Sequence, residues 1–198
     1  MSLVAPTPGV AIAAAWMAWV LSWLAAALWS RQTVARPGYG REFPNRIVTM
    51  IGALLVFASL GARRSLLAVH WSVGEALGWA LFACVVAGMA FAWWARLHLG
   101  TLWSGTVTRK HDHRIVDTGP YAVVRHPIYT GILASLGATA IESGRVEALA
   151  GVALMALGFW LKARLEEGFL AEELGAGAYA GYRARVPMLI PFTKGRAA

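Results

Sequence analysis

The stretch that decides the fold is residues 107–131, V-T-R-K-H-D-H-R-I-V-D-T-G-P-Y-A-V-V-R-H-P-I-Y-T-G. It is the longest polar interruption in a chain that is 58% hydrophobic and only 14% charged. Soluble domains average about 25% charged residues, so this composition predicts a membrane protein. We expect membrane anchors before the stretch, and after it a helical hairpin that brings a second polar cluster, Glu166 and Glu167, back towards it.

Five apolar segments are candidates for membrane-spanning helices, which need about 20 mostly apolar residues. Four of them cover residues 9–29, 47–62, 73–95 and 127–141, and the fifth starts near residue 146 and continues as a helix beyond the bilayer. A polar loop is expected at residues 31–46. The predicted fold class is therefore an all-α integral membrane protein with about five transmembrane helices, the last two a hairpin, divided into N-terminal helices (residues 1–96) and a functional core with a C-terminal cap (residues 97–198).

The distribution of basic residues predicts the orientation. With the N-terminus outside, all of the 18 Lys and Arg residues except Arg63, Arg64 and Arg145 fall on the inner side, as the positive-inside rule requires. The polar stretch and the two glutamates then share the cytoplasmic face, where we expect a cofactor pocket. The richness in alanine, arginine and glycine points to a prokaryote, and hence to its inner membrane.

The segment Arg125 to Tyr129 combines features of an anion site. His126 is expected at the cap of the fourth predicted helix, and Pro127 at its first turn, where the missing N–H costs nothing. The start of a helix offers unpaired N–H groups and partial positive charge to a carboxylate, and Arg125 adds a bidentate donor. The alternative is an interfacial belt in which arginine meets lipid phosphates and tyrosine lies among the headgroups.

The other polar features leave two interpretations each. Gly119 and Pro120 form either a plain turn or a turn that a ligand can approach closely. Glu166 and Glu167 are either a solvated helix end or carboxylates that hold an ammonium group in a cleft.

A metal centre and a nucleic-acid site are not expected. His111 and His113 have no further clustered ligand, whereas a catalytic zinc site usually has three protein ligands. The basic residues are spread over separate loops, which makes nucleic acid a poor explanation of the net charge of +8.

Two segments together resemble the isoprenylcysteine carboxyl methyltransferase family. They are H-R-I-V-D-T-G-P-Y-A-V-V-R-H-P-I-Y-T-G and, after a hydrophobic hairpin, L-E-E-G-F-L-A-E-E-L-G-A-G-A-Y-A-G-Y-R-A-R-V-P-M-L-I-P, within residues 97–192. The family is related to phospholipid N-methyltransferases. The resemblance implies an integral membrane methyltransferase that uses S-adenosylmethionine (SAM), with residues 97–198 as its core.

The resemblance also implies the site residues and the reaction. The cofactor pocket would be lined by His113, Ile115, Gly119, Pro120, Tyr121, His126 and Tyr129 and closed by Glu166 and Glu167. Arg125 and Glu167 would carry the catalytic roles. The methyl group would pass to a lipophilic acceptor that enters from the bilayer, most simply a carboxylate, with a lipid amine or a thiol as alternatives.

Two other classes of function stay open at this stage. One is a reductase-like enzyme that uses NADPH on a sterol-type double bond, although no additional nucleotide motif is visible. The other is a non-catalytic membrane interaction protein that kept the scaffold. Membrane lipids are expected partners in every case.

Overall fold

The structure is a computed structural model that describes residues 6–27, 33–35, 39–61, 69–100, 103, 109–110, 115–174 and 176–193. Within these ranges the chain forms seven helices and one two-stranded antiparallel sheet. The elements are α1 (Pro8–Ala27), β1 (Thr33–Ala35), α2 (Tyr39–Gly61), α3 (Glu75–Leu99), β2 (Arg109–Lys110), α4 (Pro120–Val123), α5 (Pro127–Ser143), α6 (Val146–Leu174) and α7 (Ala176–Arg185).

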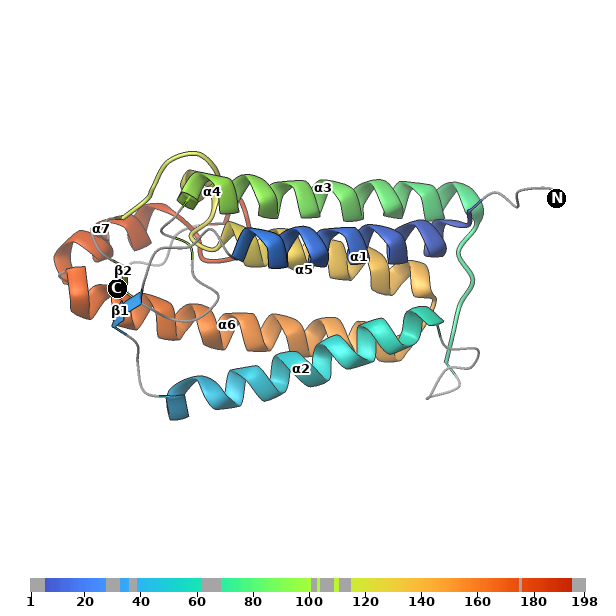
Figure 1. The fold of residues 1–198 in the computed structure, drawn as a ribbon, viewed down its shortest axis with the longest axis horizontal. Helices are drawn as coiled ribbons and strands as arrows, with labels where there is room; N and C mark the ends of the chain where they lie inside the picture. The colour runs from blue at the N-terminus through green and yellow to red at the C-terminus, as the bar shows by residue number, and fades with distance from the viewer. Residues whose placement is uncertain are drawn as a thin grey trace.

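The five longer helices lie side by side along the length of the molecule (Figure 1). The α3 helix packs on α5 and the α2 helix packs on α6, while α5 and α6 pack on each other. The short elements α4, α7 and the β1–β2 sheet gather at one end of this bundle (Figure 1). The polar residues of these segments that the structure describes are therefore collected at the end of the bundle opposite the start of α1 (Figure 1).

Four helices of the described ranges are long and apolar enough to cross a membrane. They are α1, residues Phe43–Leu60 of α2, all of α3, and residues Val146–Glu172 of α6. The all-helical membrane class is thus confirmed. The α5 helix, expected as a fifth span, has 17 residues, fewer than the roughly 20 that span a bilayer without tilt or thinning, so a count of five spans stays a prediction.

The start of α2 differs from the expectation of a loop at residues 31–46. The helix begins at Tyr39 and includes Pro44. A proline lacks the N–H of one helical hydrogen bond, but the apolar run that follows packs along α6 and keeps these early turns helical.

Small residues set the close approach of the main helix pairs. A Cβ atom at Gly131 of α5 would lie 2.5 Å from the carbonyl oxygen of Gly88 in α3. Beside this crossing the Ser135 hydroxyl donates to the carbonyl of Val85 at 2.9 Å. Glycines let two backbones meet at van der Waals distance, which drives helix association in lipid, where burial of apolar surface cannot.

We predict that Gly131→Ala destabilises the bundle by about 1–3 kcal/mol, because the new methyl group forces α3 and α5 apart. The measurement is thermal unfolding in one detergent. Gly137→Ala, in the same helix, is the control, since a Cβ there meets nothing within 4 Å. Equal midpoints for the two variants would show that the α3–α5 crossing is not as close as described.

Candidate functional site

The start of α5 is bound to the C-terminal segment by backbone hydrogen bonds. His126 is the residue before the helix and Pro127 its first residue, as expected. The amide of Arg125 donates to the carbonyl of Pro187 at 2.8 Å, and the amide of His126 donates to that of Met188 at 3.1 Å. Residues far apart in sequence therefore form one wall of the site.

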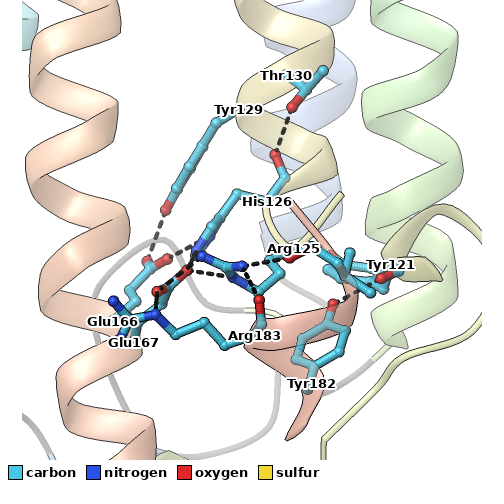
Figure 2. Close-up of polar contacts among 10 residues, drawn as sticks. Tyr121, Arg125, His126, Tyr129, Thr130, Glu166, Glu167, Tyr182 and Arg183 are labelled. Atoms are coloured by element: carbon cyan, nitrogen blue, oxygen red, sulfur yellow. Dashed lines mark hydrogen bonds and ion pairs between the residues drawn. The ribbon is translucent and has the colours of Figure 1, made fainter. Parts of the chain in front are cut away.

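Arg125 is buried, and protein acceptors engage its guanidinium on every nitrogen. Its Nε donates to Glu167 Oε1 at 2.7 Å and its Nη2 to Glu167 Oε2 at 3.3 Å. Its Nη1 donates to the carbonyls of Arg183, at 3.0 Å, and Val186. This one side chain joins α5, α6 and the C-terminal segment (Figure 2).

The two glutamates differ in how fully they are used. Glu167 accepts from Arg125 and lies 3.1 Å from His126 Nε2, and its side chain is 5% exposed. Glu166 accepts from the Tyr129 hydroxyl at 2.7 Å and lies 3.5 Å from His126 Nδ1, with 19% of its side chain exposed. Glu166 is therefore the carboxylate with more capacity for a ligand (Figure 2).

An aromatic stack stands beside the carboxylates. The Tyr129 ring is nearly parallel to His126, at 5.5 Å, and to Phe159 of α6, at 4.8 Å. The Lys162 ammonium lies 5.4 Å from the centroid of the Tyr129 ring. Stacked rings of this kind attract cations to their faces.

The neighbours of His126 favour its charged form. Burial alone would lower the pKa of His126, but its hydrogen bonds and its attraction to Glu166 and Glu167 outweigh burial and raise that pKa above its ordinary value. The imidazolium and the two carboxylates thereby neutralise much of each other's charge.

The α7 helix completes the site with two residues, Tyr182 and Arg183. The Nε atom of Arg183 lies 3.9 Å from Glu167 Oε2, and within the described part of the chain this buried atom has no hydrogen-bond partner. The Tyr182 hydroxyl donates to the carbonyl of Tyr121 at 2.8 Å. Burial raises the pKa of Tyr182, so this hydroxyl stays a donor.

The turn before α4 depends on a glycine. Gly119 has φ 56°, a left-handed conformation that favours glycine, and a Cβ there would lie 2.8 Å from the ring of His98. Tyr121 stacks on the same His98 ring with 6.3 Å between centroids. This turn therefore packs on the end of α3.

The structure brings together one part of the expected pocket. Arg125, His126, Tyr129, Glu166 and Glu167 form a single contact network. Four of the other expected residues lie elsewhere at this end of the bundle. Ile115 packs against the cluster of Tyr179, Tyr182 and Val186. Gly119 is next to the ring of His98, and Pro120 and Tyr121 are buried in α4. The last expected residue, His113, lies outside the described residues.

Sequence reasoning did not assign Arg183 or Phe159 to the site. A weak signal exists for Phe159, since Phe159, Lys162 and Glu166 recur at a spacing of three and four along one face of a helix. Arg183 follows Tyr182 directly, but nothing local to α7 shows that it meets Glu167. Among the described residues, no group of three or more His, Cys, Asp and Glu side chains is arranged to hold a metal ion.

The fold and the site together define a class: a multi-helix integral membrane protein with paired ionisable residues buried at one end of its bundle. Residues 80–172 match the model of the isoprenylcysteine carboxyl methyltransferase (ICMT) family, and this segment, which is similar to that family, holds Arg125, His126 and both glutamates. The resemblance in the sequence is thus confirmed.

Two curated proteins are similar to part of the chain. Protein-S-isoprenylcysteine O-methyltransferase B of Arabidopsis thaliana is 31% identical over 87 residues, which are 43% of this chain and 44% of that protein. The cobalt-zinc-cadmium resistance protein CzcN of Cupriavidus metallidurans is 33% identical over 99 residues, 47% of this chain and 43% of that protein. The matches therefore span less than half the length of either relative.

We predict that Arg125→Gln lowers the free energy of unfolding by about 3–5 kcal/mol, because it leaves Glu167 buried without its bidentate partner. Arg185→Gln is the matched control. Arg185 pairs with Asp117 at 3.3 Å, but its side chain is 67% exposed, so its loss costs about 1 kcal/mol or less. Denaturation of both variants in one detergent gives the comparison, and similar small losses would mean that Arg125 does not hold the site together.

We also predict a pH-dependent contribution from His126. Since its pKa is raised in the folded protein, the contribution is complete below the ordinary histidine pKa and is lost as pH rises through the native value. The difference in thermal midpoint between wild type and His126→Gln should therefore be largest below the ordinary histidine pKa and shrink as pH rises above it. A difference that grows with pH would contradict a charged His126 between the glutamates.

Proposed function

We propose that this protein is an integral membrane methyltransferase that uses SAM and transfers its methyl group to a lipophilic acceptor. The match of residues 80–172 to the ICMT family is the observation that carries the proposal. The name of the plant relative, an isoprenylcysteine O-methyltransferase, supports a carboxylate acceptor. The four apolar helices support delivery of that acceptor from the bilayer.

The donors and acceptors of the site suit the charged groups of SAM. Glu166 offers a partly exposed carboxylate to its ammonium group. The buried Nε of Arg183, which has no hydrogen-bond partner among the described residues, offers a donor to its carboxylate beside Glu167. When bound, SAM supplies the activated methyl group.

Arg125 and Glu167, expected in catalytic roles, receive a positioning role in this proposal. The donors of Arg125 are directed to Glu167 and to two backbone carbonyls, so binding a ligand carboxylate would require these hydrogen bonds to break. Arg125 instead fixes Glu167, and Glu167 orients His126. Glu166 and the Nε of Arg183 are the groups that meet the ligand in this proposal.

The chemistry of the acceptor decides whether a base is needed. A carboxylate oxygen attacks a methyl group in line and has no proton to lose, so positioning and desolvation supply the catalysis. An amine or a thiol acceptor must lose a proton, and a glutamate or a histidine of the site would then have to take it. We propose the carboxylate as the leading acceptor class, with the site on the cytoplasmic side of a prokaryotic inner membrane as the basic residues indicate.

We predict that purified protein in lipid nanodiscs binds SAM, measured by titration calorimetry. Glu166→Gln should raise the Kd about tenfold to 100-fold, since it removes a charge-assisted hydrogen bond to the ammonium group. Glu172→Gln is the control, because Glu172 is exposed on the same helix. NADPH should not compete, which separates a methyltransferase from a reductase. Absence of SAM binding in lipid and in mild detergent would refute the proposal, and unchanged affinity in Glu166→Gln would refute the pocket.

A further inference from the structure

A pocket separate from this site lies between the start of α2 and the late turns of α6. It has a volume of ≈ 300 Å³, and its lining residues are Pro44, Asn45, Trp160, Leu161, Arg164 and Leu165. Successive residues of a helix are rotated by about 100°, so Arg164 projects from α6 about 160° away from Glu166. The pocket therefore faces away from the site of the two glutamates.

The composition of both helices places this pocket at the level of a membrane interface. In α2 an uninterrupted apolar run starts at Ile47, directly after Asn45 and Arg46. In α6 the apolar run ends at Leu161, and the charged residues Lys162 and Arg164 follow it. Both helices change from apolar to polar at the pocket, which is where the phosphates of a bilayer lie.

The cation of the pocket is Arg164. Its guanidinium carbon lies 5.6 Å from the centroid of the Trp160 ring. Within the described part of the chain no carboxylate pairs with Arg164, while the Trp160 side chain is 44% exposed. An arginine held on an exposed aromatic ring keeps its forked donors for a phosphate.

Asn45 adds an acceptor that lacks a partner. The residue is 4% exposed, and its Oδ1 atom has no hydrogen-bond partner in the described part of the chain. A buried amide oxygen without a donor is costly, and native proteins satisfy such groups with bound molecules when no protein donor is available. An Oδ1 acceptor calls for an N–H or O–H group.

Apolar surface extends from the pocket towards the bilayer centre. Ile51 of α2 and Leu157 of α6 are large exposed apolar residues. Each lies seven residues, about two turns, from a lining residue on the same helix face, Ile51 from Pro44 and Leu157 from Arg164. They provide a surface for acyl chains next to a phosphate and a hydrogen-bond acceptor.

From these contacts we propose that the α2–α6 pocket binds a membrane phospholipid whose headgroup carries a hydrogen-bond donor. Arg164 binds the phosphate, and Asn45 Oδ1 accepts from the ethanolamine ammonium or the glycerol hydroxyl. Phosphatidylcholine has the same phosphate but no donor in its headgroup, so the pocket discriminates against it. The inference does not depend on methyl transfer, because the pocket and its ligand are separate from the proposed SAM site.

The test is competition among lipids on the full-length protein. Protein purified in detergent is mixed with equal amounts of dioleoyl phosphatidylethanolamine, phosphatidylglycerol and phosphatidylcholine, and the retained lipid is measured by native mass spectrometry. We expect one retained molecule, with phosphatidylethanolamine or phosphatidylglycerol preferred about fivefold over phosphatidylcholine, as one additional hydrogen bond implies. Equal retention of the three lipids would overturn the proposal.

Two variants assign the preference to the pocket. Arg164→Gln should weaken retention of every phospholipid about tenfold, because it removes the charge that meets the phosphate. Asn45→Ala should keep phosphate binding and abolish the headgroup preference, while its thermal midpoint without lipid rises or stays the same since the unpaired oxygen is gone. Unchanged retention in Arg164→Gln, or a preserved preference in Asn45→Ala, would overturn the assignment.

The controls separate a lipid from other sources of phosphate. Arg185→Gln removes the same charge from the exposed Asp117 pair and should retain lipids as wild type does. Millimolar sn-glycerol 3-phosphate should not displace the lipid, because it lacks acyl chains to cover the apolar surface. Displacement by this soluble phosphate would identify a free phosphate site and refute the lipid.

Discussion

The buried ion pair between Arg125 and Glu167 is the interaction on which the site depends. Taking both charges out of water is expensive, and their attraction repays the cost only with good geometry and further hydrogen bonds. The protein supplies both: two nitrogens of Arg125 meet Glu167, and the third meets the carbonyls of Arg183 and Val186. These contacts form only when α5, α6 and the C-terminal segment are all in place (Figure 2).

The polar residues of the site differ in how completely other groups of the protein engage them. Arg125 and Glu167 are saturated by protein partners, and His126 lies between the two glutamates. Glu166 keeps a partly exposed carboxylate, and the buried Nε of Arg183 has no hydrogen-bond partner among the described residues. A site built in this way holds its side chains at fixed positions, which is what the proposed catalysis by orientation would require. The close α3–α5 crossing at Gly88 and Gly131 fixes the position of α5, whose first residues are part of the site.

Much of this could be predicted from the sequence, because hydrophobic run lengths and capping chemistry are local. The start of α5 at Pro127 and the meeting of Arg125, His126 and Tyr129 with the glutamates follow from a helical hairpin of matched length. The two backbone partners of Arg125 could not be predicted, since these carbonyls lie about 60 residues away in the sequence. Arg183 was missed for the same reason. The first turns of α2 were assigned to a loop because Pro44 and the charges around it outweigh the helical packing that only the α6 contact supplies.

Amide hydrogen exchange with and without SAM tests most directly whether the three segments form one ligand site. The amides of Arg125 and His126 are hydrogen bonded to Pro187 and Met188, so exchange there reports on the closure of the C-terminal segment over α5. The account predicts that SAM slows exchange together in peptides covering residues 124–130, 163–170 and 179–188. Protection confined to one of these peptides, or no protection in any of them, would contradict it.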